Sequence, residues 1–223
     1  AMAINGTAVG VLAEEAKRIG AAMIHYSTDY VFDGTKDSPY TEEDEPNPIN
    51  VYGKTKLAGE LALQSAGVPY LILRTSWVYG LRGKNFLLTI LRLAKERDEI
   101  KVVDDQMGSP TWSRMIAEAT AQLLLQFTIP PMSITECAGL YHLSCTGETS
   151  WYGFANAILQ KLDSKEYESE KKCSIVPIKS VDYKTPAKRP KNSCLSLDKL
   201  EQCFALRMPD WSLALDLGIK ELI

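Results

Sequence analysis

Short apolar runs alternate with helical segments from the first residues of this 223-residue chain to about residue 146. Asn5 is expected to cap the first helix and Gly20 to end it. Strand-length runs lie at 21–26, 68–73 and 140–144, and helices are expected at 5–19, 50–65, 85–96 and 113–127. Strands that alternate with helices of this length predict βαβ units, and hence an α/β fold with a parallel sheet.

The pattern changes after Ile100. A polar loop, a helix, a charged loop, a short strand and a basic proline-containing stretch are expected at 104–112, 150–162, 163–172, 174–178 and 183–192. We interpret this part as a smaller α/β domain. The expected division gives residues 1–98 and 113–146 to the sheet domain, and residues 99–112 and 147–223 to the smaller domain.

Charge and composition exclude several classes of protein. The net charge of −3 argues against nucleic acid as a partner, and no run of 18 apolar residues could span a membrane. The start has no basic segment followed by an apolar stretch, so no signal peptide is expected. The five cysteines form no C-x-x-C pair, which favours reduced thiols in a cytoplasmic protein. With only His25 and His142, a zinc site is not expected.

The glycine pattern of a dinucleotide-binding turn is absent from the sequence. No G-x-G-x-x-G occurs, and Gly53-Lys54-Thr55 fails as a P-loop because Pro48 stands where the first glycine is required. The chain opens on a helix with no strand before it. We therefore expect that a strand and a glycine-rich turn precede it in the natural protein, and that this chain alone binds NADPH weakly and turns over poorly.

Tyr52 and Lys56 stand at positions i and i+4 of the helix expected at 50–65, so their side chains share one face. A phenol with a pKa of about 10 is a poor acid or base at neutral pH. A lysine ammonium beside it favours the phenolate and lowers that pKa, which suits proton transfer to or from a carbonyl or alcohol oxygen. The pair alone is also typical of a solvated helix face.

The wider context resembles a known family. The order Asn5, Thr28, Tyr52, Lys56 resembles the catalytic tetrad of the short-chain dehydrogenase/reductase superfamily. Longer strings resemble the dTDP-4-dehydrorhamnose reductases, at 25–34, 50–60, 74–80, 104–112, 147–152 and 189–193. The resemblance implies a Rossmann-like, doubly wound sheet without its N-terminal strands, and a C-terminal substrate domain. It implies NADPH-dependent reduction of dTDP-4-dehydro-L-rhamnose to dTDP-L-rhamnose, for cell-wall polysaccharide or lipopolysaccharide synthesis.

The resemblance also implies roles for single residues. Tyr52 would give a proton to the C4 oxygen of the keto sugar, while Lys56 would lower the pKa of Tyr52 and hold the nicotinamide ribose. Thr28 would hydrogen-bond the same sugar oxygen, and Asn5 would anchor a water relay through its backbone. The resemblance implies that Tyr26 lines the cofactor side of the site. It implies that three further residues contact the sugar or the nucleotide: Asp29, Tyr30 and Trp77. Arg189 is a candidate partner of the diphosphate.

Other interpretations stay open. One is a non-catalytic regulatory subunit similar to the beta subunit of methionine adenosyltransferase, and another is an extended reductase or epimerase for a different nucleotide sugar. NADH is possible in place of NADPH. Trp77, Tyr30 and Phe32 could be core residues, and Trp112 and Trp151 are expected to pack rather than bind.

Some reductases of this family form magnesium-bridged dimers through a glutamate after the G-x-P-T loop, where this chain has Arg114. A guanidinium offers no oxygen ligand to magnesium. We expect a monomer or a metal-independent dimer, with Arg114 an ordinary helix-face residue.

Overall fold

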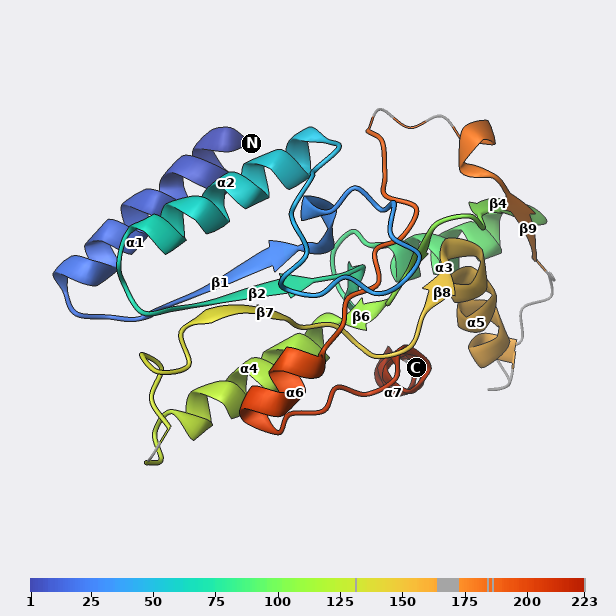
Figure 1. Cartoon of the computed structure of the whole chain (residues 1–223). Coiled ribbons are helices and arrows are strands. Elements are labelled where there is room, and N and C mark those ends of the chain that lie inside the picture. Colours follow the sequence, from blue (N-terminus) through green and yellow to red (C-terminus); the bar gives the residue numbers. More distant parts are fainter. Residues whose placement is uncertain (131, 164–172, 184, 186, 223) are drawn as a thin grey trace.

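A computed structural model describes residues 1–130, 132–163, 173–183, 185 and 187–222. A parallel sheet of three strands lies at its centre, β1 (Met23–Thr28), β2 (Tyr70–Thr75) and β7 (Gly139–His142), in the order β1-β2-β7. The helices α1 (Ala8–Arg18) and α2 (Val51–Ser65) cover one face of this sheet, and α4 (Ser113–Gln126) and α6 (Asp198–Phe204) cover the other (Figure 1). This layering confirms the predicted α/β class.

The first helix differs from the prediction at its start. Asn5 is no N-cap, because it lies inside a π-helical turn, Ala3–Thr7, that runs directly into α1. Its backbone N–H already donates to the Ala1 carbonyl at 2.9 Å, and its side chain donates to Thr55 instead of capping. The prediction for the other end is confirmed, since Gly20 follows the helix with φ of +68°.

Two later helices begin where the sequence predicts. The side chains of Asn50 and Asn85 accept hydrogen bonds from Gly53 N (2.8 Å) and Leu88 N (3.1 Å), and so cap α2 and α3 (Phe86–Glu96). Each cap satisfies one backbone donor at the first turn. The start of α2 matters most here, because it carries Tyr52.

The central strands are displaced from the predicted apolar runs: β7 spans Gly139–His142 and ends two residues before the predicted run 140–144, whereas β1 and β2 begin and end later than predicted. β1 begins at Met23 rather than Ala21 and continues through Thr28, which pairs with Thr75 at the end of β2. β2 likewise ends two residues beyond the predicted Leu73. The polar residues at these ends stay in the strands because parallel pairing satisfies their backbone groups. A 3-10 turn, η2 (Asp29–Val31), follows β1 directly.

The remaining strands form small pairs beside the sheet. β4 (Glu99–Val103) pairs in parallel with β9 (Ser174–Ile178), as β3 (Val78–Tyr79) does with β6 (Thr111–Trp112). β5 (Met107–Gly108) is antiparallel to β8 (Thr149–Ser150). The chain is completed by α5 (Trp151–Asp163), the 3-10 turn η3 (Ser180–Asp182) and α7 (Trp211–Leu222). Most of the predicted charged loop, 164–172, lies outside the described residues.

Two clusters of buried side chains hold these elements together. In one, Leu87 and Ile90 of α3 share a core with Phe154 of α5. In the other, Leu200 of α6 packs with Leu71 of β2. Both contacts run across the expected domain division, which stays a prediction. None of the helices in the described ranges is long and apolar enough to cross a membrane, and no disulfide joins two cysteines of this part of the chain.

Candidate active site

The start of α2 lies against the turn that follows β1. A Cβ atom at Gly53 would lie 2.0 Å from the Tyr30 carbonyl oxygen, so only glycine allows η2 to approach the first turn of α2 this closely. As a result the Tyr30 and Tyr52 rings meet edge to face, with centroids 5.9 Å apart and an interplanar angle of 80°. The sequence places these residues apart, and the tertiary contact brings them together.

Tyr52 and Lys56 share one face of α2, as the spacing predicts. The Tyr52 side chain is 48% exposed. Lys56 is half-buried, and its Nζ donates to the Tyr26 carbonyl at 2.5 Å and lies 3.4 Å from His25 Nε2. The ammonium is thereby held at the edge of β1, while the phenol stays open to a ligand.

The protonation of this pair differs from the expectation. The pKa of Tyr52 lies above its ordinary value, because burial and the Asp29 charge outweigh the neighbouring Thr28 hydroxyl, which acts to lower it. Burial lowers the pKa of Lys56, against the opposing effect of Glu60. Tyr52 is therefore a neutral phenol across the neutral pH range. This form retains the proton that an acid must deliver.

Thr28 and Asp29 form a buried hydroxyl–carboxyl pair beside Tyr52. Both are within the protein, at 5% and 3% exposure. Thr28 Oγ1 lies 2.8 Å from Asp29 Oδ1, and the other carboxyl oxygen accepts a hydrogen bond from Ser76 at 3.0 Å. Burial raises the pKa of Asp29 to about 6, although hydroxyl donors act to lower it. Asp29 thus contacts Thr28 from the protein interior and does not face solvent.

Asn5 is tied to the helix that carries Tyr52. Its amide donates to Thr55 Oγ1 at 3.1 Å, and Thr55 in turn donates to the Tyr52 carbonyl at 3.0 Å. A Cβ atom at Gly59 would lie 2.1 Å from the Asn5 carbonyl oxygen, so the π-helical turn lies directly on α2. The structure thus places Asn5 directly against α2; the water relay stays a prediction.

The predicted aromatic ligands lie in different surroundings. The Tyr26 hydroxyl is 2.7 Å from Thr120 Oγ1 on α4, and the ring is 42% exposed. Trp77 is only 9% exposed and stacks on Trp151 with centroids 3.5 Å apart. Its φ of +46° is unusual for a bulky residue. Trp112 is buried in the core, as predicted.

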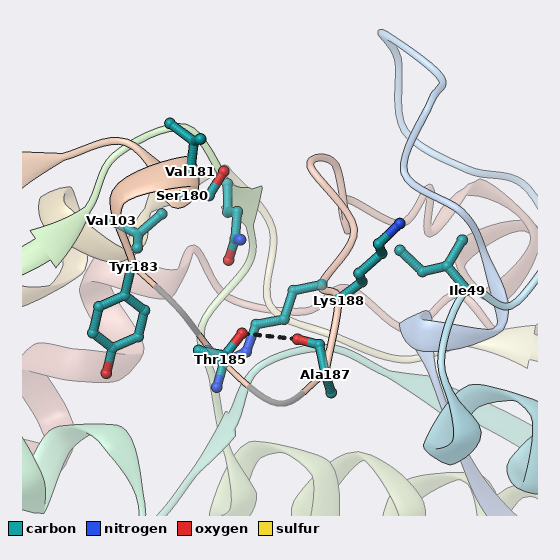
Figure 2. Close-up of a pocket in the computed structure, with 10 residues that line it drawn as sticks. Ile49, Val103, Ser180, Val181, Tyr183, Thr185, Ala187 and Lys188 are labelled. Carbon is teal, nitrogen blue, oxygen red and sulfur yellow. Dashed lines mark hydrogen bonds between the residues drawn. The ribbon is translucent and has the colours of Figure 1, made fainter.

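Arg189 lines a hollow beside the start of α2. The cavity measures about 380 Å³ and is lined by residues of β4, η3 and the basic stretch, among them Val103, Gln106, Tyr183, Lys188 and Arg189. Figure 2 shows Lys188 and Ile49 on one side of this hollow and Val103 and Tyr183 on the other. The positive charge of Arg189 also acts to lower the pKa of Tyr30, which burial raises to about 12. Arg189 is therefore close enough to Tyr30 for its charge to act on that side chain.

Arg114 pairs with two carboxylates. It contacts Glu118 at 2.7 Å and Glu221 of α7, and stands over the Trp112 ring. Among the described residues, no group of His, Cys, Asp and Glu side chains could hold a metal ion.

Several residues of the site carry no local sequence signal. Asn50 caps α2 and also donates to the Lys188 carbonyl at 3.0 Å, across 138 positions of the chain. Ser76 reaches Asp29, and Arg74 forms a buried bidentate pair with Glu60, one turn beyond Lys56. The sequence gives one hint of the Arg74–Glu60 pair, because Arg74 directly follows an apolar strand-length run. A fully buried arginine needs an oppositely charged partner.

Asn50→Ala is expected to lower the free energy of unfolding by about 1–2 kcal/mol, because it removes the cap of α2 and its bond to Lys188. Urea unfolding measures this change. Asn50→Asp is the matched variant, since its carboxylate still accepts from Gly53 N but cannot donate to the Lys188 carbonyl. Equal stability of the Ala variant and the unchanged chain would contradict a capping role.

Comparisons with known proteins agree with this arrangement. A family model described as the RmlD substrate binding domain matches residues 1–223. The dTDP-4-dehydrorhamnose reductase of Burkholderia thailandensis is 48% identical over 100% of this chain and 75% of its own length. That of Escherichia coli K12 is 45% identical over 100% of the chain and 73% of its length.

Solved structures show the same relationship. The crystal structure of the Bacillus anthracis dTDP-4-dehydrorhamnose reductase in complex with NADP superposes with a TM-score of 0.89. It shares 36% sequence identity, over 99% of this chain and 73% of that chain. The fold, the match over the whole chain and the tyrosine–lysine face thus point the same way, and the chain belongs to the dTDP-4-dehydrorhamnose reductase family.

Proposed function

We propose that this protein reduces the 4-keto group of dTDP-4-dehydro-L-rhamnose to the alcohol of dTDP-L-rhamnose with NADPH. The observation that carries the proposal is the half-exposed Tyr52 at the carboxyl end of β1, beside Lys56, Thr28 and Tyr30. Ligands of parallel α/β sheets bind at this edge. The reductases that the chain resembles, one of them solved with NADP, support this substrate and cofactor.

The residues of this face fit the nicotinamide end of the cofactor. Tyr52 and Lys56 present hydrogen-bond donors on one accessible side of α2, and Lys56 contacts the backbone carbonyl of Tyr26. The Tyr26 ring is 42% exposed and lies toward Thr120 of α4. We infer that Lys56 holds the ribose hydroxyls and Tyr26 lines the cofactor. NADPH, when bound, supplies the hydride.

Tyr52 is the proposed acid. Its raised pKa keeps the phenol protonated until the sugar oxygen gains charge. Thr28 supports the same oxygen by a hydrogen bond, and the Lys56 ammonium stabilises the phenolate that remains. Because the oxygen becomes basic only during reduction, these contacts act in the transition state more than in the ground state.

We assign the nucleotide end of the substrate to the hollow beside Arg189. A diphosphate needs cationic partners, and Lys188 and Arg189 supply them in a chain of net charge −3. The Tyr30 ring contacts Tyr52 and is influenced by the Arg189 charge, which suits a sugar bound beside these residues. We propose that the buried Asp29 contributes to this binding through Thr28. Trp77 packs behind the site and is proposed to shape the pocket wall.

The direct test is NADPH oxidation by the full-length protein with dTDP-4-dehydro-L-rhamnose. Turnover with this sugar and formation of dTDP-L-rhamnose is the expected result, with NADH compared in parallel. A UDP-linked 4-keto sugar serves as the comparison substrate. No oxidation of either cofactor with the dTDP sugar would contradict the proposal, and would favour a non-catalytic role.

Arg189→Ala is expected to raise KM for the dTDP sugar about tenfold, equivalent to about 1.4 kcal/mol, with kcat nearly unchanged. The reason is loss of one charge-assisted contact with the diphosphate, away from the reacting carbon. Steady-state kinetics at several salt concentrations measure it. Arg82→Ala, another exposed arginine, is the control and should leave KM unchanged. A drop in kcat with an unchanged KM would contradict a role of Arg189 in binding the diphosphate.

We further propose that the reaction takes place in the cytoplasm and that the protein is a monomer or a metal-independent dimer. The ion pairs of Arg114 with Glu118 and Glu221 support a surface role for this segment.

A further inference from the structure

The hydroxyl of Thr28 has one hydrogen, and three acceptors can take it: the Asp29 carboxyl group, the Tyr52 phenol oxygen and the keto oxygen of a bound sugar. Thr28 Oγ1 lies 2.8 Å from Asp29 Oδ1, and an ionised carboxylate there can only accept. The oxygen of a ketone also only accepts. The Tyr30 N–H donates to Thr28 Oγ1 at 3.2 Å and so uses a lone pair of the hydroxyl, not its hydrogen. With Asp29 ionised, Thr28 therefore cannot support the sugar oxygen while keeping its bond to Asp29.

The surroundings of Asp29 favour its neutral form. The carboxyl group is 3% exposed, and its contacts are the hydroxyls of Thr28, Ser76 and Ser193 rather than cations; their hydrogen bonds act to lower its pKa, but burial outweighs them. Ser76 Oγ lies 3.0 Å from Asp29 Oδ2 and 3.2 Å from the Ser193 carbonyl, so its single hydrogen serves only one of two acceptors. An isolated buried carboxylate is costly, and such a group takes up a proton instead.

The titratable groups around Asp29 supply no positive charge. Burial raises the pKa of Tyr30 of η2, Tyr52 of α2 and Cys194 of the C-terminal segment, and a charge on Asp29 raises each of them further, while Arg189 acts on Tyr30 in the opposite direction. Burial raises the pKa of Asp29 itself to about 6, near neutral pH. Both protonation states are thus within reach.

We propose that Asp29 is a positioning residue that must be neutral during reduction: it donates its proton to Thr28 Oγ1, and this turns the Thr28 hydrogen toward the keto oxygen. This inference rests on the proposed function, and it concerns how the protonation of Asp29 governs the same active site. No covalent bond of Asp29 or Thr28 changes. The proton delivered to the sugar still comes from Tyr52, and the hydrogen on Thr28 stays on its oxygen.

This arrangement has a definite pH signature. The competent form is lost as the pH rises through the pKa of Asp29, so the rate of the reduction step should fall tenfold per pH unit above that value. The fall lies well below the pH at which Tyr52 ionises, since the pKa of Tyr52 is raised above its ordinary value. The two ionisations are therefore separable.

The test is the pH dependence of single-turnover reduction in the full-length protein, with Asp29→Asn and Asp29→Leu compared. The amide group of the Asp29→Asn side chain donates permanently to Thr28 Oγ1, so this variant should be flat from about pH 5 to 8 and match or exceed the unchanged protein at the upper end. Leucine cannot donate, and a loss of tenfold or more is expected at every pH. In a Thr28→Val background, replacing Asp29 by asparagine should no longer alter the pH profile.

Thermal unfolding gives a readout independent of activity. A group whose pKa is raised on folding, here from 3.8 to about 6, disfavours the fold once it is ionised. Asp29→Asn should therefore raise Tm at about pH 8 and not at about pH 4. A pH fall retained in the Asp29→Asn variant, or an Asp29→Asn variant as slow as the Asp29→Leu variant, would overturn the proposal. If the unchanged protein reduces no dTDP sugar at any pH, the proposed function fails instead.

Discussion

Tyr52→Phe in the full-length protein is expected to lower kcat by a factor of about 10²–10⁴, the range that a positioned general acid supplies. The phenylalanine keeps the ring and its edge-to-face contact with Tyr30, but has no proton for the sugar oxygen. KM for the nucleotide sugar should change little, because the lost interaction forms in the transition state. Pre-steady-state kinetics with NADPH measure the reduction step directly.

Tyr30→Phe is the matched control. Tyr30 is the ring that faces Tyr52, and burial raises its pKa to about 12, so its hydroxyl is a poorer proton donor. The control should retain most of kcat, since Tyr30 gives no proton; any effect on KM would reflect its proposed contact with the sugar. A Tyr52→Phe variant with more than about a tenth of the original kcat would show that Tyr52 is not the acid, because general acid catalysis typically contributes a rate factor of about 10²–10⁴.

Glu60→Gln is expected to lower the free energy of unfolding by about 3–5 kcal/mol, the usual cost of leaving a buried charge without its partner. Arg74 donates to both oxygens of Glu60, at 3.0 and 2.7 Å, and the two side chains are 3% and 1% exposed. The pair joins α2 to β2 directly beneath Lys56. Urea unfolding monitored by circular dichroism measures the loss.

Two variants make this test specific. Replacing both partners by apolar residues of similar size, Glu60→Leu with Arg74→Met, should restore most of the stability, because no buried charge remains. Glu96→Gln breaks the exposed Arg92–Glu96 pair of α3 and should cost only about 0.3–0.5 kcal/mol. A Glu60 variant as stable as the Glu96 variant would show that water reaches the pair.

Local sequence was sufficient for the elements that carry the site. The i, i+4 spacing placed Tyr52 and Lys56 on one face of α2, and the helix expected at 50–65 agrees with α2 to within one residue. β9 was predicted to the residue, and α4 within one residue. Periodicity and caps act within a few residues of the chain, so they can be recognised without knowledge of the fold.

Local patterns failed where a residue's surroundings come from distant segments. Asparagine is a residue type that often caps helices. In this fold, however, the π-helical turn packs against Gly59, and the Asn5 side chain donates to Thr55 instead. Trp77 follows a strand at the ligand-binding edge, yet Trp151 covers it. No pattern of 3.6 or two residues can describe such contacts.

The sequence by itself determined an α/β chain with a tyrosine–lysine pair at one sheet edge, since helix and strand periods are local properties. Only the tertiary structure decided the charge states around that pair. In the sequence Asp29 only follows the strand expected at 21–26, but in the fold it is buried and its carboxyl group contacts Thr28 and Ser76. Burial depends on what the rest of the chain places around a group, and burial sets the cost of its charge.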